Sequence, residues 1–154
     1  MNEVLKQFTH LKIHTQYSIC EGALRTTELA RHCKSNKIMA IGLCDSNNLC
    51  GALEFSEIMA KSKTQPIIGT QINIKYKGYK GKIPLFAKNL EGYKNLIKLS
   101  SKSFLEVEDN EDPHCLINDL IKNYKRLIML SGTSTGLIGK LFSKNLNDEI
   151  ILIL

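Results

Sequence analysis

The amino-acid sequence predicts an α/β fold, in which strands and helices alternate along the chain. Residues 38–44 form a short continuous apolar run, which is typical of a buried strand, and Pro66 opens a second strand at 67–76. Apolar residues at helical spacing follow the first stretch, whereas another strand, at 83–87, comes between residue 76 and the next apolar residues at helical spacing. This order favours a parallel sheet or barrel flanked by helices.

The first 63 residues predict two strands, each followed by a helix. Alternation and β-branching indicate the first strand, and a continuous apolar run indicates the second. A threonine can cap the first helix, and Glu28 suits its first turn. The expected elements are a strand at 8–14, a helix from Thr26 or Thr27 to about Asn36, a strand at 38–44, a polar turn at 45–48 and a helix from Leu49 to near Lys63.

Proline and glycine divide the second half of the chain. Pro66 opens a strand that reaches Tyr76, and Gly78 and Gly81 break a lysine-rich hairpin. Asp112 followed by proline predicts a helix start, with a cap and then a first-turn proline. The other expected elements are a strand at 83–87, a helix at 93–104, an acidic loop at 106–112, a helix at 113–121, a strand at 126–130, a turn at 131–136 and a helix at 137–142.

The sequence stops on five apolar residues, 150–154, which predict one more strand. A finished domain rarely leaves such a strand at its terminus unless the strand inserts into a sheet. We therefore expect the sequence to be part of a longer architecture.

Composition limits the classes of function. The chain has 154 residues, 43 % of them apolar, which suits one domain or part of a larger one. No apolar run approaches the roughly 20 residues needed to span a bilayer, and the start lacks the hydrophobic block of a signal peptide. We therefore expect a cytoplasmic protein with no membrane partner. Five cysteines without a C-x-x-C pair favour reduced thiols over disulfides or a zinc ribbon.

The net charge of +6 is unevenly distributed. Residues 75–102 contain eight lysines and one acid, whereas residues 106–119 contain six acids and no lysine or arginine. Such asymmetry can indicate a face that binds nucleic acid, or two surfaces that neutralise each other. The candidate nucleic-acid contacts are Lys75, Lys77, Lys80 and Lys82.

The active sites of α/β barrels lie at the carboxyl ends of the strands. The polar residues expected there are at 14–18, 45–48, 70–71 and 131–135. As metal ligands the chain offers His14, Glu21 and Asp45, whereas each Zn²⁺ or Mn²⁺ needs three or four protein ligands. From the residues alone, a structural role for His14 at the barrel mouth and a turn or capping role for Asp45 are favoured over metal binding.

Five segments carry a family resemblance: FTHLKIHTQYS at 8–18, AIGLCDSNNLCGA at 40–52, QPIIGTQ at 65–71, AKNLEGYKNLIKLS at 87–100 and LIMLSG at 127–132. In order and spacing they resemble the N-terminal PHP (polymerase and histidinol phosphatase) domain of the alpha subunit of bacterial replicative DNA polymerases, the C family. The fourth segment is typical of the polymerase subunit rather than of free PHP phosphatases. The resemblance covers about residues 8–145.

The resemblance implies a distorted (β/α)₇ barrel, of which residues 1–154 would form only the first part, before the barrel is complete. The palm, fingers and thumb of the polymerase would lie beyond residue 154. DNA-directed DNA polymerase activity, with its Mg²⁺, would therefore belong to the parent protein, and no catalytic residue is expected in this fragment.

The resemblance also locates seven metal-ligand positions of active PHP domains. They fall at Lys12, His14, Glu21, Ser46, Gln71, Lys82 and Thr133. Five lack a suitable ligand, which leaves His14, Glu21 and the nearby Asp45 as vestiges of the site. A lysine in place of a ligand repels a cation, by about 4 kcal/mol at about 4 Å with an effective dielectric constant of about 20. We hypothesise that Lys12 or Lys82 pairs with Glu21 or Asp45 and holds the barrel mouth together without a metal.

The resemblance implies a role in DNA replication as a scaffold and as the docking module for the proofreading exonuclease subunit. The other expected partners are the remainder of the polymerase chain and, through the parent protein, primer-template DNA. No cofactor is expected in the fragment. Three alternatives stay open: a PHP phosphoesterase or exonuclease that depends on Zn²⁺ or Mn²⁺, direct DNA binding by the lysines, and a non-functional remnant of a split polymerase gene.

Overall fold

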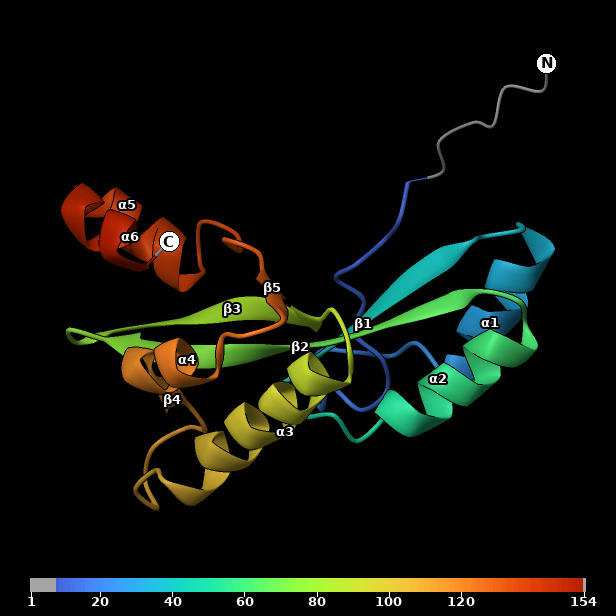
Figure 1. Cartoon of the computed structure of the whole chain (residues 1–154), viewed down its shortest axis with the longest axis horizontal. Helices are drawn as coiled ribbons and strands as arrows, with labels where there is room; N and C mark the ends of the chain where they lie inside the picture. The colour runs from blue at the N-terminus through green and yellow to red at the C-terminus, as the bar shows by residue number, and fades with distance from the viewer. Residues whose placement is uncertain (1–7, 154) are drawn as a thin grey trace.

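The computed structural model of the chain describes residues 8–153 (Figure 1). Strands of a mixed sheet alternate with helices, so the expected α/β class is confirmed. In chain order the elements are α1 (Thr26–Ser35), β1 (Ala40–Ser46), α2 (Ala52–Lys61), β2 (Gln65–Tyr76), β3 (Tyr79–Ala87), α3 (Leu90–Leu105), β4 (Cys115–Leu116), α4 (Ile117–Asn123), β5 (Leu127–Met129), α5 (Leu137–Ser143) and α6 (Asn147–Ile153).

The sheet is mixed, where the sequence had favoured a parallel one. β1 runs parallel to the first half of β2, and β4 runs parallel to β2 further along. β3 is antiparallel to both β2 and β5. The cause is the two-residue loop of Lys77 and Gly78, both at positive φ, because so short a connection can join only antiparallel strands. Gly81 lies inside β3 and does not break it.

Residues 8–14 were expected to form a strand, but they form an irregular extended segment along the free edge of β1. The amide of Gly42 donates to the carbonyl of His10 at 2.7 Å, and the amide of Cys44 donates to the carbonyl of Ile13 at 2.8 Å. Between these bonds β1 advances by two residues and the segment by three. The amide of Ile13 turns back to the carbonyl of Leu11, at 3.2 Å, and this local turn absorbs the extra residue.

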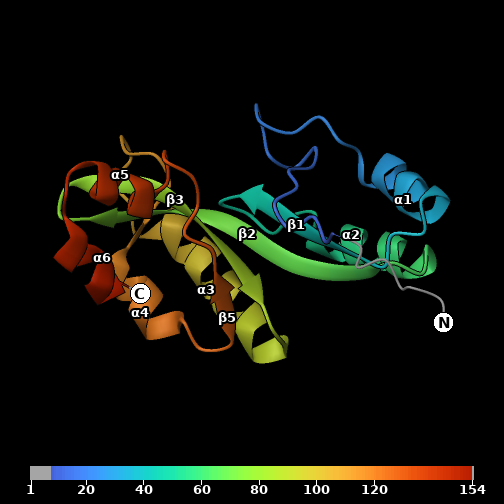
Figure 2. The same ribbon diagram turned by 90° about the horizontal axis from the view of Figure 1, so that it is seen from above.

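Two hydrophobic clusters hold the sheet between its helices. In one, β2 and β3 pack against α3, α4 and α5 through residues such as Ile72, Leu85 and Leu99. In the other, β1 packs against α1 and α2, with Phe55 and Met59 fully buried. Figure 2 shows α1 and α2 at the end of the molecule opposite α5 and α6, and β2 runs between the two groups. Each cluster thus supports one end of the same long strand.

The predicted helix start at Asp112 and Pro113 is wrong. The chain stays extended there because β2 binds it: the Asn73 side-chain amide donates to the carbonyl of Pro113 at 3.0 Å, and Cys115 pairs with Ile74. α4 therefore begins at Ile117. Its capping carboxylate is that of Asp119, which accepts a hydrogen bond from the amide of Leu116 at 3.1 Å.

The expected strand at 150–154 is also wrong: α6 covers this stretch as far as Ile153, and Leu154 lies outside the described residues. Asp148 and Glu149 occupy the first turn of α6, where negative charge favours a helix. Glu149 accepts hydrogen bonds at 2.5 Å from the hydroxyl of Tyr76 and the ammonium of Lys77. Ile150 and Ile153 pack against the first cluster.

Two smaller expectations also need correction. Thr26 does not cap α1, because Arg25 is the N-cap residue and the Thr26 hydroxyl donates to the Glu54 carboxylate instead. The turn expected at 45–48 begins only at Asn47, since Asp45 and Ser46 complete β1. The helices expected at 93–104 and 137–142, the acidic loop at 106–112 and the strand at 126–130 are confirmed within a few residues.

None of the helices formed by residues 8–153 is both long and apolar enough to cross a membrane.

Candidate functional site

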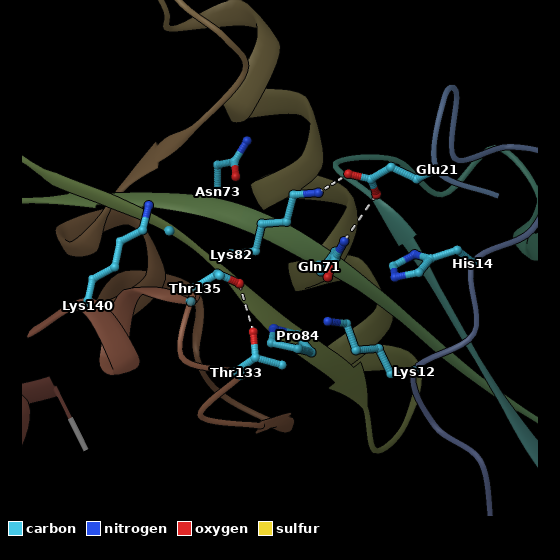
Figure 3. A pocket seen from close by; sticks show the side chains of 13 residues that line it. Lys12, His14, Glu21, Gln71, Asn73, Lys82, Pro84, Thr133, Thr135 and Lys140 are labelled. Carbon is cyan, nitrogen blue, oxygen red and sulfur yellow. Dashed lines mark hydrogen bonds and ion pairs between the residues drawn. The ribbon is translucent and has the colours of Figure 1, made fainter. Parts of the chain in front are cut away.

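An open pocket of about 420 Å³ lies between the N-terminal segment, β2, β3 and the loop that leads into α5 (Figure 3). Six of the seven ligand positions line it: Lys12, His14, Glu21, Gln71, Lys82 and Thr133. Ser46, the seventh, contacts three of the six through hydrogen bonds: it donates to Glu21 and accepts from Gln71 and Lys82. Residues from five parts of the sequence thus converge on one place.

Strand pairing brings these side chains together. The parallel register places Ser46 of β1 opposite Gln71 of β2, and the antiparallel register places Lys82 of β3 opposite Asn73. Gln71 and Asn73 are two residues apart on one strand and therefore face the same side of the sheet. The irregular segment on the outer edge of β1 adds Lys12 and His14.

The centre of the site is an ion pair between Lys82 and Glu21, which are 61 residues apart in the sequence. The Ser46 hydroxyl also donates to the Glu21 carboxylate, and the Gln71 amide nitrogen lies 3.4 Å from it. The Lys82 ammonium, and next the Ser46 hydroxyl, hold the pKa of Glu21 below its ordinary value. Glu21 is therefore bound by Lys82, Ser46 and Gln71, three residues that stand where the resemblance implies a metal ligand.

Asp45 ties a loop to the end of β1 instead of facing the pocket. Its fully buried carboxylate accepts hydrogen bonds from the Thr15 amide at 2.6 Å, the Thr15 hydroxyl at 2.7 Å and the Ser18 hydroxyl at 2.6 Å. The Ser18 oxygen in turn accepts from the amide of Ser46 at 3.1 Å. This network holds residues 15–18 in place, and these residues lead directly into the segment that carries Glu21.

His14 lines the pocket beside the ion pair. Burial is the main cause that lowers its pKa, and the positive charges of Lys12 and Lys82 act in the same direction, whereas Glu21 and Asp45 oppose them. Its Nδ1 lies 3.5 Å from the Ser18 hydroxyl. The imidazole is therefore mainly neutral at pH 7 and forms a polar, uncharged part of the pocket wall.

These residues do not fit a metal ion. The carboxylate of Asp45 is occupied by Thr15 and Ser18, and that of Glu21 by Lys82 and Ser46. Two ammonium groups, of Lys12 and Lys82, line the pocket that a cation would enter. Within residues 8–153 no three or more His, Cys, Asp and Glu side chains form a group that could hold a metal.

The hypothesis that Lys12 or Lys82 pairs with Glu21 or Asp45 is met for one combination, and that this pair replaces a metal in holding the site together stays a prediction. Lys82 pairs with Glu21. Lys12 lines the pocket and forms no ion pair with any residue from 8 to 153. Its positive charge helps to lower the pKa of His14.

The lysines of the hairpin form ion pairs at the surface. Each of the four candidate nucleic-acid contacts has an acidic partner, and the partners of Lys75 and Lys80 come from the acidic loop. The ion pairs are Lys75 with Glu111 at 2.9 Å, Lys77 with Glu149 at 2.5 Å, Lys80 with Asp112 at 3.4 Å, and Lys82 with Glu21. The pairs of Lys75 and Lys80, and those of Lys102 with Glu106 and Asp119, join the two charge blocks, and for these lysines the structure favours mutual neutralisation.

Sequence reasoning missed two polar pocket residues, Asn73 and Lys140, whereas Thr135 lies within the expected polar stretch at 131–135. Asn73 lies two residues after Gln71 on a predicted strand, so the alternation of side chains could have indicated it. Lys140 lies on α5, and nothing in its local sequence indicates that its ammonium reaches the carbonyl of Lys80 at 2.7 Å.

The ion pair predicts a dependence of stability on pH. Folding lowers the pKa of Glu21 from 4.5, so its stabilising contribution is complete above pH 4.5 and is lost as the pH falls through the lower folded value. Because both side chains are more than a third exposed, we expect at most about 1 kcal/mol. In urea unfolding, the stability difference between the wild type and Glu21→Gln should shrink towards zero in acid. A difference that does not change with pH would contradict the pair.

Comparison with known proteins identifies close sequence relatives. The family model described as PHP domain matches residues 10–153. DNA polymerase III subunit alpha of Rickettsia conorii is 40 % identical over 147 residues, which cover 95 % of this chain and 12 % of that protein. The same subunit of Haemophilus influenzae is 33 % identical over 147 residues, or 94 % of this chain and 13 % of the relative. The chain thus spans about an eighth of the length of these relatives.

A solved structure has a similar fold. The crystal structure of a candidate metal-dependent phosphoesterase from Bifidobacterium adolescentis superimposes with a TM-score of 0.50. The match covers 62 % of this chain and 32 % of the other, at 14 % sequence identity. Likeness at this level of identity concerns the fold alone.

Proposed function

The chain belongs to the PHP domain family, and from that premise we propose that it acts in DNA replication, in the cytoplasm, as part of the alpha subunit of a replicative DNA polymerase. Its role there is that of a scaffold and a docking module for the proofreading exonuclease subunit, without catalysis of its own. The observation that carries the proposal is the 40 % identity to an alpha subunit over 95 % of the chain.

The ion pair supports the non-catalytic part of the proposal. A metal-dependent phosphoesterase needs carboxylates and imidazoles free to bind cations. Here Glu21 is bound by Lys82, and Asp45 holds the loop of Thr15 and Ser18. The pocket therefore favours a structural function over phosphoester hydrolysis.

An apolar surface supports the remainder of the polymerase chain as a partner. Among residues 8–153, β5 pairs with a strand on one edge only. Beside it lies a pocket of about 330 Å³ with a mainly apolar lining, from residues such as Ile121, Met129 and Leu152. We propose that later segments of the polymerase continue the sheet at β5 towards a distorted (β/α)₇ barrel and cover this surface.

The docking role is tested by mixing the purified chain with the purified exonuclease subunit from the same genome. We expect the two to elute together in size-exclusion chromatography and to bind in a one-to-one ratio by titration calorimetry. The double variant Glu21→Gln, Lys82→Met removes the ion pair of the pocket, and its titration under the same conditions shows whether docking depends on the pocket. Folded chains that stay separate at high concentration would reject the docking role.

Two measurements distinguish the phosphoesterase alternative from the proposal: the metal content of the purified chain and its release of phosphate. The proposal expects no stoichiometric Zn²⁺ or Mn²⁺ in the purified chain, and no hydrolysis of a phosphomonoester beyond the rate of the Glu21→Gln variant. Bound metal together with hydrolysis that this substitution abolishes would favour the enzyme instead.

Direct DNA binding through the lysine hairpin is the weaker proposal, because each of its ammonium groups already has a carboxylate partner. A protein that neutralises phosphates loses affinity steeply with salt as counterions are released. Oligonucleotide affinity with a steep salt slope that Lys75→Met and Lys77→Met reduce would favour this alternative.

A further inference from the structure

The helices α1 and α2 end in the same way, each with a lysine at positive φ. Lys37 follows the C-cap of α1 at a φ of 52°, and Lys63 follows that of α2 at 59°. The amide after each lysine, of Ile38 and of Thr64, donates to a carbonyl of the last helical turn, at 2.9 and 3.0 Å. Glycine suits such a position best, because a side chain opposes the left-handed conformation. The backbone of these helix ends therefore does not call for lysine.

The two helix ends lie side by side. Each leads directly into one of the parallel strands β1 and β2. The amide of Gln65 donates to the carbonyl of Met39 at 2.8 Å, and the hydroxyl of Thr64 donates to the carbonyl of Ile38 at 2.9 Å. Figure 2 shows α1 and α2 together at one end of the molecule. The two lysine turns are thus neighbours at the amino end of the parallel pair.

A pocket of about 410 Å³ lies at these two turns, with a positively charged lining. Among its lining residues are four exposed lysines and no acid: Lys34, Lys37, Lys61 and Lys63. None of the four forms an ion pair with a residue from 8 to 153. In this they differ from the lysines of the hairpin, each of which has a carboxylate partner.

The same pocket has an apolar part. Ile38, which is half-buried, and Met39, which is 71 % exposed, contribute side chains to its lining. The methylene stems of the lysines can add to this apolar surface while their ammonium groups stay in water. A ligand that matches the pocket therefore combines an apolar group with negative charges around it.

We propose that this pocket binds an acidic peptide segment of a partner protein, in which a large apolar side chain is flanked by carboxylates. The apolar side chain lies over Ile38 and Met39, and the carboxylates pair with the four ammonium groups. Positive charge at a helix end explains the last-turn residues Lys34 and Lys61 without a ligand. The ligand explains why lysine also stands at the two positions that favour glycine.

The lining favours a peptide over nucleic acid. Single strands bind through aromatic side chains on which bases stack, and duplexes through phosphate contacts in which arginine is frequent. The pocket lining contains neither an aromatic residue nor an arginine. Phosphates would also leave the apolar part of the pocket unused, whereas a leucine or phenylalanine side chain would fill it.

The pocket is separate from the ion pair of Lys82 and Glu21. It lies before the first residue of β1, Ala40, whereas Ser46, which contacts that ion pair, is the last. Six residues of extended strand place the two sites about 20 Å apart. The proposal is therefore independent of that site, and it holds whether or not the exonuclease subunit docks on this chain.

The test is titration of the whole chain into the fluorescein-labelled peptide EDELFDEE, followed by fluorescence polarisation at fixed ionic strength. The peptide should bind with a dissociation constant below about 1 mM. The peptide EDESSDEE lacks the apolar centre, and QNQLFNQQ lacks the charges. Each should bind roughly tenfold more weakly, because the pocket uses both kinds of contact.

The double variant Lys37→Gly, Lys63→Gly removes two of the four charges and places the favoured residue at both helix ends. It should keep a thermal midpoint at least as high as that of the wild type and bind EDELFDEE roughly tenfold more weakly. Lys94→Gln, Lys98→Gln is the matched control, because it removes two exposed lysines of α3 outside the pocket lining, and it should leave the affinity unchanged.

Equal affinity of the wild type and the glycine variant for EDELFDEE would overturn the proposal, as would the absence of binding by the folded wild type. A single-stranded oligonucleotide that binds more tightly than the peptide, and loses that affinity in the glycine variant, would assign the pocket to nucleic acid and overturn the proposal as well.

Discussion

Asp45→Ala is expected to lower the free energy of unfolding by about 4 kcal/mol, the largest effect of any single change near the site. The fully buried carboxylate accepts three hydrogen bonds of 2.6 to 2.7 Å, from Thr15 and Ser18. Its removal leaves buried donors of the loop unpaired, and the loss per charged hydrogen bond is about 1.5 to 3 kcal/mol. Urea unfolding followed by circular dichroism measures the effect.

Two variants make this experiment specific. Asp45→Asn keeps one acceptor oxygen but turns an amide group towards a donor, so its loss should be smaller than that of alanine but still substantial. Asp109→Ala removes an exposed carboxylate from the acidic loop and should stay within about 0.5 kcal/mol of the wild type. If Asp45→Ala cost as little as Asp109→Ala, the loop would not depend on this carboxylate.

Gly42→Ala is expected to cost about 3 kcal/mol, because the N-terminal segment lies directly against the backbone of β1. A Cβ atom at position 42 would stand 2.4 Å from the carbonyl oxygen and 2.6 Å from the Cα of Leu11. Both are backbone atoms, which cannot turn aside as a side chain would. The segment must move away, and the bond from the Gly42 amide to the carbonyl of His10 is weakened with it.

The displaced segment carries Lys12 and His14 out of the pocket, so limited trypsin digestion after Lys12 should be faster in Gly42→Ala, alongside the loss in urea unfolding. Gly78→Ala is the contrasting variant. Its Cβ meets nothing within 4 Å, and only the positive φ of 83° opposes it, so we expect about 1 kcal/mol and unchanged cleavage at Lys12. Equal cleavage of the two variants would argue against the close approach.

Expectations that rest on local patterns were confirmed where the pattern was long. The apolar spacing of residues 93–104 specifies α3, and the run that begins at Pro66 specifies β2. The five apolar residues at 150–154 were too few to separate strand from helix, and the packing of Ile150 and Ile153 on the first cluster decided for α6. The motif of Asp112 and Pro113 was outweighed by a hydrogen bond from Asn73, which is distant in the sequence.

By itself the sequence determined the alternation of strands and helices and the membership of a family, and it predicted the positions at which metal ligands of that family are replaced. These depend on residue identity and on periods of a few residues, which are local. The tertiary structure alone decided that Lys82 meets Glu21, that the acidic loop supplies the partners of Lys75 and Lys80, and that Gln71 keeps a buried oxygen without a partner among residues 8–153. Those contacts join residues that only strand register and packing bring together, and a linear pattern does not encode them.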